Sequence, residues 1–95
     1  MSSVFSPFAK YKKERLKQVL KFIAENKKVE VNRLIGKFCI DWGITQKKVL
    51  QYIDELKAAG YIITETVYPE NVYAEPITFV AITNSGKEAA EKEEW

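Results

Sequence analysis

The sequence predicts an α+β domain with three helices, a β-hairpin and a short helix near the end of the chain. Three segments of the first 60 residues carry apolar residues at spacings of three and four, which is the pattern of a helix with one buried face. Two later segments, YIITETV and ITFVAIT, are rich in β-branched and aromatic residues, which favour strands. Because 95 residues suffice for one small domain, we expect residues 1–95 to form a single unit.

The composition is that of a globular protein and excludes several classes of function. Hydrophobic residues make up 46% of the chain and charged residues 29%, which argues against disorder. The chain has no histidine and one cysteine, Cys39, so it lacks the commonest general base and zinc ligand and cannot form an internal disulfide. We therefore expect no catalytic residues, no metal site, no cofactor and no enzymatic activity, and we expect Cys39 to be a buried thiol.

The chain also lacks the sequence features of a membrane or secreted protein. The N-terminal residues MSSVFSPFAK contain no long apolar run of the kind found in a signal peptide. No stretch approaches the roughly 20 apolar residues that span a bilayer. We expect a cytoplasmic, intracellular protein without membrane contact, and nothing in the sequence indicates a small-molecule ligand.

The first helix is predicted over residues 7–26, and a short strand follows it. Ser6 can cap this helix, and Pro7 suits its first position. The apolar stripe repeats at helical spacing and consists of Leu16, Val19, Leu20 and Ile23. Residues 29–31, Val-Glu-Val, are β-branched and alternating, so they predict a minimal strand.

The second helix is predicted over residues 33–42, after Asn32 as its cap. The residues that it is expected to bury are Leu34, Ile35, Phe38, Cys39 and Trp42. Gly43 is the expected left-handed terminator, because glycine adopts that conformation without strain.

The third helix is predicted over residues 46–59, after a three-residue turn in which Thr45 is the cap. Its buried stripe, with spacings of four and three, consists of Val49, Ile53 and Leu56. The residues expected to flank the stripe are Leu50, Tyr52 and Ala59. Gly60 is expected to end the helix and lead into the first strand of the hairpin.

A hairpin over residues 61–82 and a last helix over residues 84–94 complete the prediction. The two β-rich segments are separated by YPENVYAEP, whose two prolines and asparagine indicate a loop. Thr83 or Ser85 can cap the last helix, and Ser85 and Glu88 have the spacing of a capping box.

Two segments resemble the winged helix-turn-helix family of DNA-binding proteins. GITQKKVLQYIDELKAAGYI (residues 43–62) is similar to the family's turn, capping hydroxyl, recognition helix and entry into the wing hairpin. FVAITNSGKEA (residues 79–89) is similar to the end of the second wing strand followed by Thr-x-x-Gly, as in regulators of the MarR and PadR type. The resemblance covers roughly residues 8–92 and is greatest to small single-domain regulators of archaea, or of archaeal plasmids and viruses.

The resemblance implies a winged helix-turn-helix fold with a three-helix core, a β-hairpin wing and a short C-terminal helix. It implies a sequence-specific protein that binds double-stranded DNA as a homodimer and inserts its third helix into the major groove. Such a protein is a transcriptional regulator that acts by occupying its site, where it blocks or recruits polymerase.

Lys47 and Lys48 lie in the first turn of the predicted third helix, where cations are unfavourable. The N-terminal end of a helix carries partial positive charge, so each lysine there costs about 0.3–1 kcal/mol. Phosphates or guanine acceptors reverse this effect, because they attract both ammonium groups and the helix end. In helix-turn-helix proteins, the N-terminal residues of the second helix of the motif enter the major groove. The two lysines therefore favour contact with nucleic acid over a merely solvated surface.

The predicted DNA contacts project from the outer face of this helix. Gln51 can pair both of its polar atoms with an adenine edge, and Lys47 can donate to O6 and N7 of guanine. The residues better placed for backbone phosphates are Thr45, Gln46 and Lys48, together with Arg33 at the start of the second helix. Asp54 and Glu55 are expected on the outer face of the C-terminal half of the third helix.

Charge is unevenly distributed, and the predicted wing is acidic. Residues 1–60 hold 13 basic and 6 acidic residues, whereas residues 61–95 hold 2 and 7. The wing carries Glu70 and Glu75, with Glu65 nearby, and no Lys or Arg, so we expect its tip not to enter the minor groove. The net charge of +2 argues against a sequence-blind DNA-packaging protein. The acidic surface leaves open an alternative function, a winged-helix protein–protein interaction module in a transcription or membrane-remodelling assembly.

Aromatic residues outside the predicted core indicate a dimer interface. They are Phe5, Phe8, Tyr11, Phe22 and Trp95. Unplaced aromatic residues near chain ends are common interface anchors, and in related regulators the first and last helices form the two-fold contact. A symmetric dimer would set two copies of the third helix about 34 Å apart and recognise an inverted repeat. The alternative is that these aromatic residues complete one small core.

Overall fold

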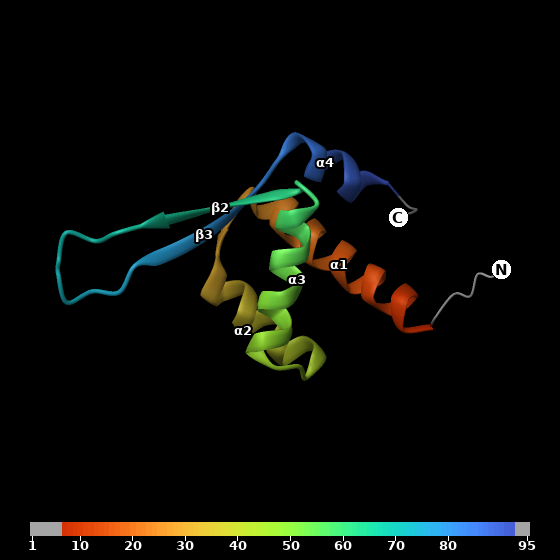
Figure 1. Ribbon diagram of the computed structural model, residues 1–95, viewed down its shortest axis with the longest axis horizontal. Helices are drawn as coiled ribbons and strands as arrows, with labels where there is room; N and C mark the ends of the chain where they lie inside the picture. The colour runs from red at the N-terminus through yellow and green to blue at the C-terminus, as the bar shows by residue number, and fades with distance from the viewer. Residues whose placement is uncertain (1–6, 93–95) are drawn as a thin grey trace.

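Within residues 7–92, four helices and three strands follow one another along the chain. The computed structural model describes these residues, and their side chains from Lys12 onward. The elements are α1 (Pro7–Asn26), β1 (Lys28–Glu30), α2 (Val31–Trp42), α3 (Gln46–Ala58), β2 (Ile62–Val67), β3 (Ile77–Ile82) and α4 (Asn84–Glu91) (Figure 1). The predicted α+β class is therefore confirmed.

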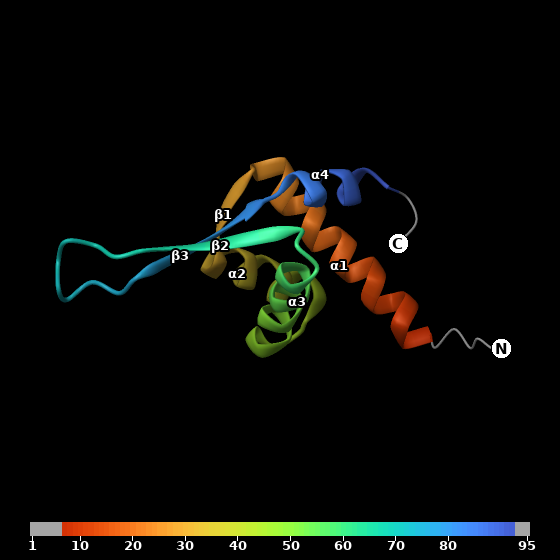
Figure 2. The same ribbon diagram turned by 45° about the horizontal axis from the view of Figure 1, so that its top comes forward.

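The strands form a small antiparallel sheet in the order β1-β3-β2. Val29 of β1 pairs with Val80 of β3, and Ile62 of β2 pairs with Ile82 of β3. Because side chains alternate along a strand, one face of the sheet packs against the helices and the other is open. Beyond β1, the strands β2 and β3 continue as a hairpin that projects away from the helices (Figures 1 and 2).

The core lies where the helices meet the covered face of the sheet. Its largest fully buried side chains are Val19, Leu20, Ile23, Leu34, Val49, Leu56, Ile62 and Val80. Each such burial contributes about 1.5–3 kcal/mol, so this cluster holds α3 against the rest of the fold. Tyr52, expected to flank the stripe of α3, is instead buried, because its hydroxyl meets Arg15 of α1 and its ring meets Trp42 of α2.

Local chemistry sets both ends of α3. Gly43 has a φ of 63°, the left-handed conformation that was predicted to end α2. The hydroxyl oxygen of Thr45 accepts a hydrogen bond from the Lys48 amide at 3.2 Å, so Thr45 is the predicted cap. Gly60 has a φ of 81° and lets the chain turn from α3 into β2. The helix itself ends at Ala58, one residue earlier than expected.

The start of α2 differs from the prediction, because Asn32 does not cap it. β1 covers residues 28–30, one residue earlier than expected, and α2 begins directly at Val31. The N-cap residue is Glu30, whose side chain makes no capping hydrogen bond. Glu30 pairs with Phe79 of β3, and this pairing holds it in the extended conformation. A contact with a distant strand therefore overrides the capping tendency of Asn32.

The side of α2 that faces the core is less deeply buried than predicted. Leu34 and Phe38 are buried, as expected. Ile35, Cys39 and Trp42 pack against the core but are only half-buried, because they lie at its edge. The thiol of Cys39 is therefore not the fully buried group that the sequence predicted.

Thr83, and not Ser85, fixes the start of α4. The hydroxyl oxygen of Thr83 accepts a hydrogen bond from the Gly86 amide at 3.0 Å, and the hydroxyl donates to the carbonyl oxygen of Gly60 at 2.7 Å. Ser85 lies inside the helix, so the predicted capping box with Glu88 is wrong. One side chain thus ties the start of α4 to the end of α3, across 23 residues of sequence.

The last helix, α4, is shorter than the predicted 84–94. It ends at Glu91, and Lys92 is extended. The predicted cap of α1, Ser6, lies outside the described residues. Between residues 7 and 92, no helix combines the length and the apolar character needed to cross a membrane.

Candidate nucleic-acid interface

The beginning of α3 forms an exposed surface that we call the α3 tip. It is defined by Thr45, Gln46, Lys47, Lys48 and Gln51. In both ribbon views this end of α3 lies at the edge of the molecule, away from the sheet and from α4 (Figures 1 and 2). Four of the five side chains, all except Lys48, are exposed. Nothing in the described part of the chain therefore covers the outward side of the α3 tip.

The α3 tip concentrates positive charge. The first turn of α3 contains no acidic residue, although acidic residues are the ones that stabilise this end of a helix. Lys47 and Lys48 add two full positive charges to the partial charge of the helix end. An anion in front of α3 would be attracted by all of these groups together.

Lys48 has a different environment from Lys47. Its side chain is half-buried, and Nζ lies 5.5 Å from the centre of the Tyr52 ring. Arg15 of α1 approaches the same place: Nη1 donates to the Tyr52 hydroxyl at 3.4 Å, and Cζ lies 5.1 Å from the centre of the Trp42 ring. The prediction that Lys48 points outward is therefore wrong in part. Arg15 was missed, because it reaches α3 only through the packing of α1 on α3 and no motif marks it.

Glu55 does not lie on the outward face of α3, where it was predicted. Its carboxylate forms an ion pair with Lys12 of α1. Asp54 is exposed, as expected, and lies three residues beyond Gln51, at the C-terminal border of the α3 tip. Of the two acidic residues of α3, the ion pair thus directs Glu55 towards α1, and Asp54 stays on the outward face.

Arg33 is exposed but does not belong to the α3 tip. It lies in the first turn of α2, with Cζ 6.0 Å from the centre of the Phe22 ring. A helix rises about 1.5 Å per residue, so Arg33 lies about 13 Å along α2 from Trp42, where the turn into α3 begins. Lys37, one turn further on, forms an ion pair with Asp41 at 3.0 Å. Arg33 can therefore hold a phosphate only as a separate, flanking contact.

The hairpin formed by β2 and β3 is acidic and apolar, and residues 61–82 contain no Lys or Arg. At its tip, the side chain of Asn71 accepts a hydrogen bond from the Tyr73 amide at 3.0 Å and stabilises a turn. Glu70 and Glu75 flank this turn and are exposed. The hairpin holds six of the eight large apolar side chains exposed in the described part of the chain: Ile63, Val67, Tyr68, Val72, Tyr73 and Ile77.

The residues predicted for a dimer interface are described only in part. Outside the described side chains lie Phe5, Phe8, Tyr11 and Trp95. Phe22 is half-buried and packs edge-on against Phe38 of α2, with ring centres 5.9 Å apart. Phe22 thus contributes to the packing of its own chain, which is the alternative that the sequence left open.

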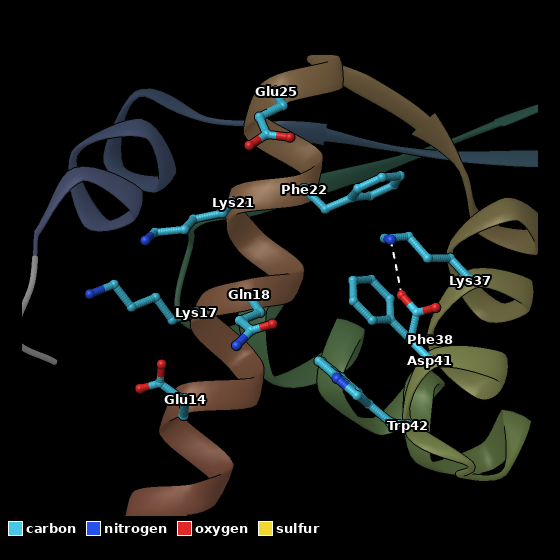
Figure 3. Close-up of a pocket in the computed structure, with 10 residues that line it drawn as sticks. All are labelled: Glu14, Lys17, Gln18, Lys21, Phe22, Glu25, Lys37, Phe38, Asp41 and Trp42. Carbon is cyan, nitrogen blue, oxygen red and sulfur yellow. Dashed lines mark hydrogen bonds and ion pairs between the residues drawn. The ribbon is translucent and has the colours of Figure 1, made fainter.

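An open groove of about 370 Å³ lies between α1 and α2 (Figure 3). The rings of Phe22, Phe38 and Trp42 lie along it. Its charged lining residues are Glu14, Lys17, Lys21, Glu25, Lys37 and Asp41. Because three cations and three anions balance, the groove has no evident preference for a charged ligand. Across the described residues, no three His, Cys, Asp or Glu side chains are grouped as a metal site would require.

No family model, curated protein or solved structure matches this chain. Function must therefore be inferred from the surfaces themselves. The α3 tip combines exposed polar side chains, two lysines and a helix N-terminus without an acidic residue in its first turn. This combination suits a polyanion.

Proposed function

We propose that this protein is a winged helix-turn-helix protein that binds specific sequences of double-stranded DNA and regulates transcription. The observation that carries the proposal is the exposed α3 tip, with two lysines and no acidic residue in the first turn of α3. The order of the elements and the β1-β3-β2 sheet support this fold assignment. In this arrangement α2 and α3 are the helix-turn-helix, and the β2–β3 hairpin is the wing.

The side chains of the α3 tip divide into two roles. Lys47 and Gln51 are exposed and one turn apart, so they can face base edges in the major groove, guanine for the lysine and adenine for the glutamine. Lys48 lies to one side against Tyr52, which suits a phosphate on the wall of the groove. Thr45 and Gln46 at the helix end suit phosphates too. Base contacts specify the sequence, and phosphate contacts fix the position of α3.

A homodimer is part of the proposal. Two base-contacting side chains on one α3 recognise only a few base pairs. Two copies related by a two-fold axis double the site and recognise an inverted repeat with half-sites about 34 Å apart. The bound dimer would act by occupying its site. It would either keep polymerase off the DNA that it covers or recruit polymerase to that DNA.

Selection from a library of random duplexes at moderate salt, followed by sequencing, tests the function. We expect enrichment of a palindrome with one helical turn between half-site centres. Retention of all sequences alike would indicate a sequence-blind protein, and no retention at low salt would contradict DNA binding altogether.

Replacing Arg33 with alanine tests the flanking phosphate contact. We expect weaker binding to all duplexes alike and a slope of log affinity against log salt that is smaller by about one unit. The control is Lys87→Ala. Lys87 is exposed and belongs to α4, and this helix lies away from the start of α3 in Figure 1. A sequence-dependent loss, or the same slope change in the control, would contradict the assignment of Arg33.

The hairpin supports a second candidate function, a protein–protein interaction module in a transcription or membrane-remodelling assembly. Its exposed tyrosines and apolar residues, together with its carboxylates, are typical of a protein-binding surface. This candidate predicts no salt-dependent affinity for DNA. The two functions are compatible only if the hairpin stays clear of DNA when the α3 tip is bound.

Replacing Tyr73 with alanine tests whether the hairpin tip touches DNA. Tyr73 is 92% exposed, so its loss should leave the fold intact. We expect affinity for the selected duplex to change by no more than about twofold, the usual range for a surface position without a contact. The paired variant Glu70→Gln with Glu75→Gln should bind as well as wild type or better, because it makes no DNA contact at this site and loses two negative charges that repel a polyanion at long range. A loss of tenfold or more in either protein would place the wing on DNA.

A further inference from the structure

One large apolar side chain interrupts the polar outward face of α3. Leu50 is 37% exposed. Of its neighbours three and four positions away on the helix, Gln46, Lys47 and Asp54 are exposed, whereas Ile53 belongs to the buried stripe. Apart from the hairpin, the described chain exposes only one other large apolar side chain, Ile40 of α2. Leu50 therefore adds an apolar side chain to the edge of the helix face that would lie in the major groove, next to the buried stripe.

We propose that Leu50 is a specificity-determining residue that packs against the C5-methyl group of thymine. The inference rests on the proposed function, since it requires α3 to lie in the major groove. Thymine presents a methyl group at the major-groove edge, and apolar side chains recognise it there. Contact removes both apolar groups from water, whereas a cytosine amino group or a guanine oxygen against Leu50 would lose its hydrogen-bonding water.

The spacing along α3 gives the expected position of this thymine. An α-helix rises about 1.5 Å per residue and duplex DNA about 3.4 Å per base pair. Leu50 lies three residues beyond Lys47, so it faces a base pair about one step from the guanine that Lys47 contacts. Successive side chains of a helix point about 100° apart, so Leu50 and Gln51 face different parts of the groove and are expected to act on neighbouring base pairs.

The test uses the duplex enriched by library selection, resynthesised with uracil in place of one thymine at a time. Uracil lacks only the C5-methyl group. Wild-type protein is expected to bind about fourfold more weakly for each contacted methyl that is removed, the effect of one buried methyl group. Leu50→Ala is expected to bind the thymine and uracil duplexes equally. The control, Val72→Ala, removes an exposed apolar side chain from the hairpin and should respond to uracil as wild type does.

The outcomes separate this inference from the function on which it rests. If a palindrome is enriched but no uracil duplex differs from its thymine parent, Leu50 does not recognise thymine, while DNA binding stands. If uracil weakens wild type and Leu50→Ala equally, the methyl group acts through DNA shape, and the inference is also overturned. If no duplex is enriched, both proposals fail. The first of these outcomes is measured on wild-type protein alone, so the inference can be overturned however well Leu50→Ala folds.

Discussion

Replacing Gly86 with alanine is expected to destabilise the fold by about 1–3 kcal/mol or more, the cost of overpacking a tight contact. A β-carbon at this position would overlap the carbonyl oxygen of Tyr61 and lie 2.8 Å from Cδ1 of Ile82. The first of these neighbours is backbone and cannot rotate away. Nor can α4 simply move back, because the Gly86 amide is hydrogen-bonded to Thr83, which also holds Gly60.

Thermal denaturation measures this effect, and Gly36→Ala provides a matched control. For a domain of this size, each kcal/mol shifts the Tm by roughly 4–8 °C. Gly36 is also helical, but apart from its chain neighbours and its own helical backbone, no atom lies within 4 Å of the position that its β-carbon would take. Alanine there should raise stability by about 0.5–1 kcal/mol, because glycine in a helix interior costs that much. Shifts of equal sign in the two variants would contradict the close packing of α4 against the start of β2.

Replacing Lys47 with alanine is expected to weaken binding to the selected duplex by about 1–3 kcal/mol, or roughly 5- to 150-fold. Lys47 is exposed and forms part of the α3 tip, so the lost interaction is with DNA rather than with the fold. Discrimination should relax at one base pair per half-site, because the other contacts stay in place. Titration against duplexes that vary each base pair in turn measures both effects.

The same substitution should leave the free protein slightly more stable. Removing a cation from the N-terminal turn of α3 relieves about 0.3–1 kcal/mol of repulsion. The control is Lys57→Ala, at the opposite end of the same helix, where a cation is favourable. That variant should lose a little stability and retain its affinity for DNA. If Lys47→Ala bound DNA as well as wild type, the α3 tip would not be the surface that contacts bases.

The sequence predicts α3 well, because the groups that set its ends are local. The cap at Thr45 and the two left-handed glycines around α3 act within one turn, so their chemistry is visible in a short segment. The same holds for the start of α4, where Thr83, one of the two predicted caps, is confirmed through its local bond to the Gly86 amide, and Ser85 is not the cap. The predicted cap Asn32 failed for the opposite reason. Strand pairing, a contact between distant parts of the chain, places the start of α2.

The position of the α3 tip also follows from the sequence, since an outward face lies opposite a buried stripe. The sequence does not predict which side chains lie at the edges of that face. Lys48 and Glu55 lie on the flank towards α1, where helical spacing alone does not distinguish solvent from a neighbouring helix. Arg15 meets Tyr52 across 37 residues of sequence, which no local pattern indicates. Such tertiary contacts decide whether a charged side chain faces solvent or contacts its own chain.

Whether α3 docks on duplex DNA is tested most directly by following backbone amide resonances during titration with the selected duplex. We predict that the amide resonances of residues 45–51 shift most, that the resonance of Arg33 also shifts, and that those of the non-proline residues among 68–76 at the hairpin tip do not shift. Resonances of residues 45–51 that do not move at saturating duplex would contradict DNA recognition by α3.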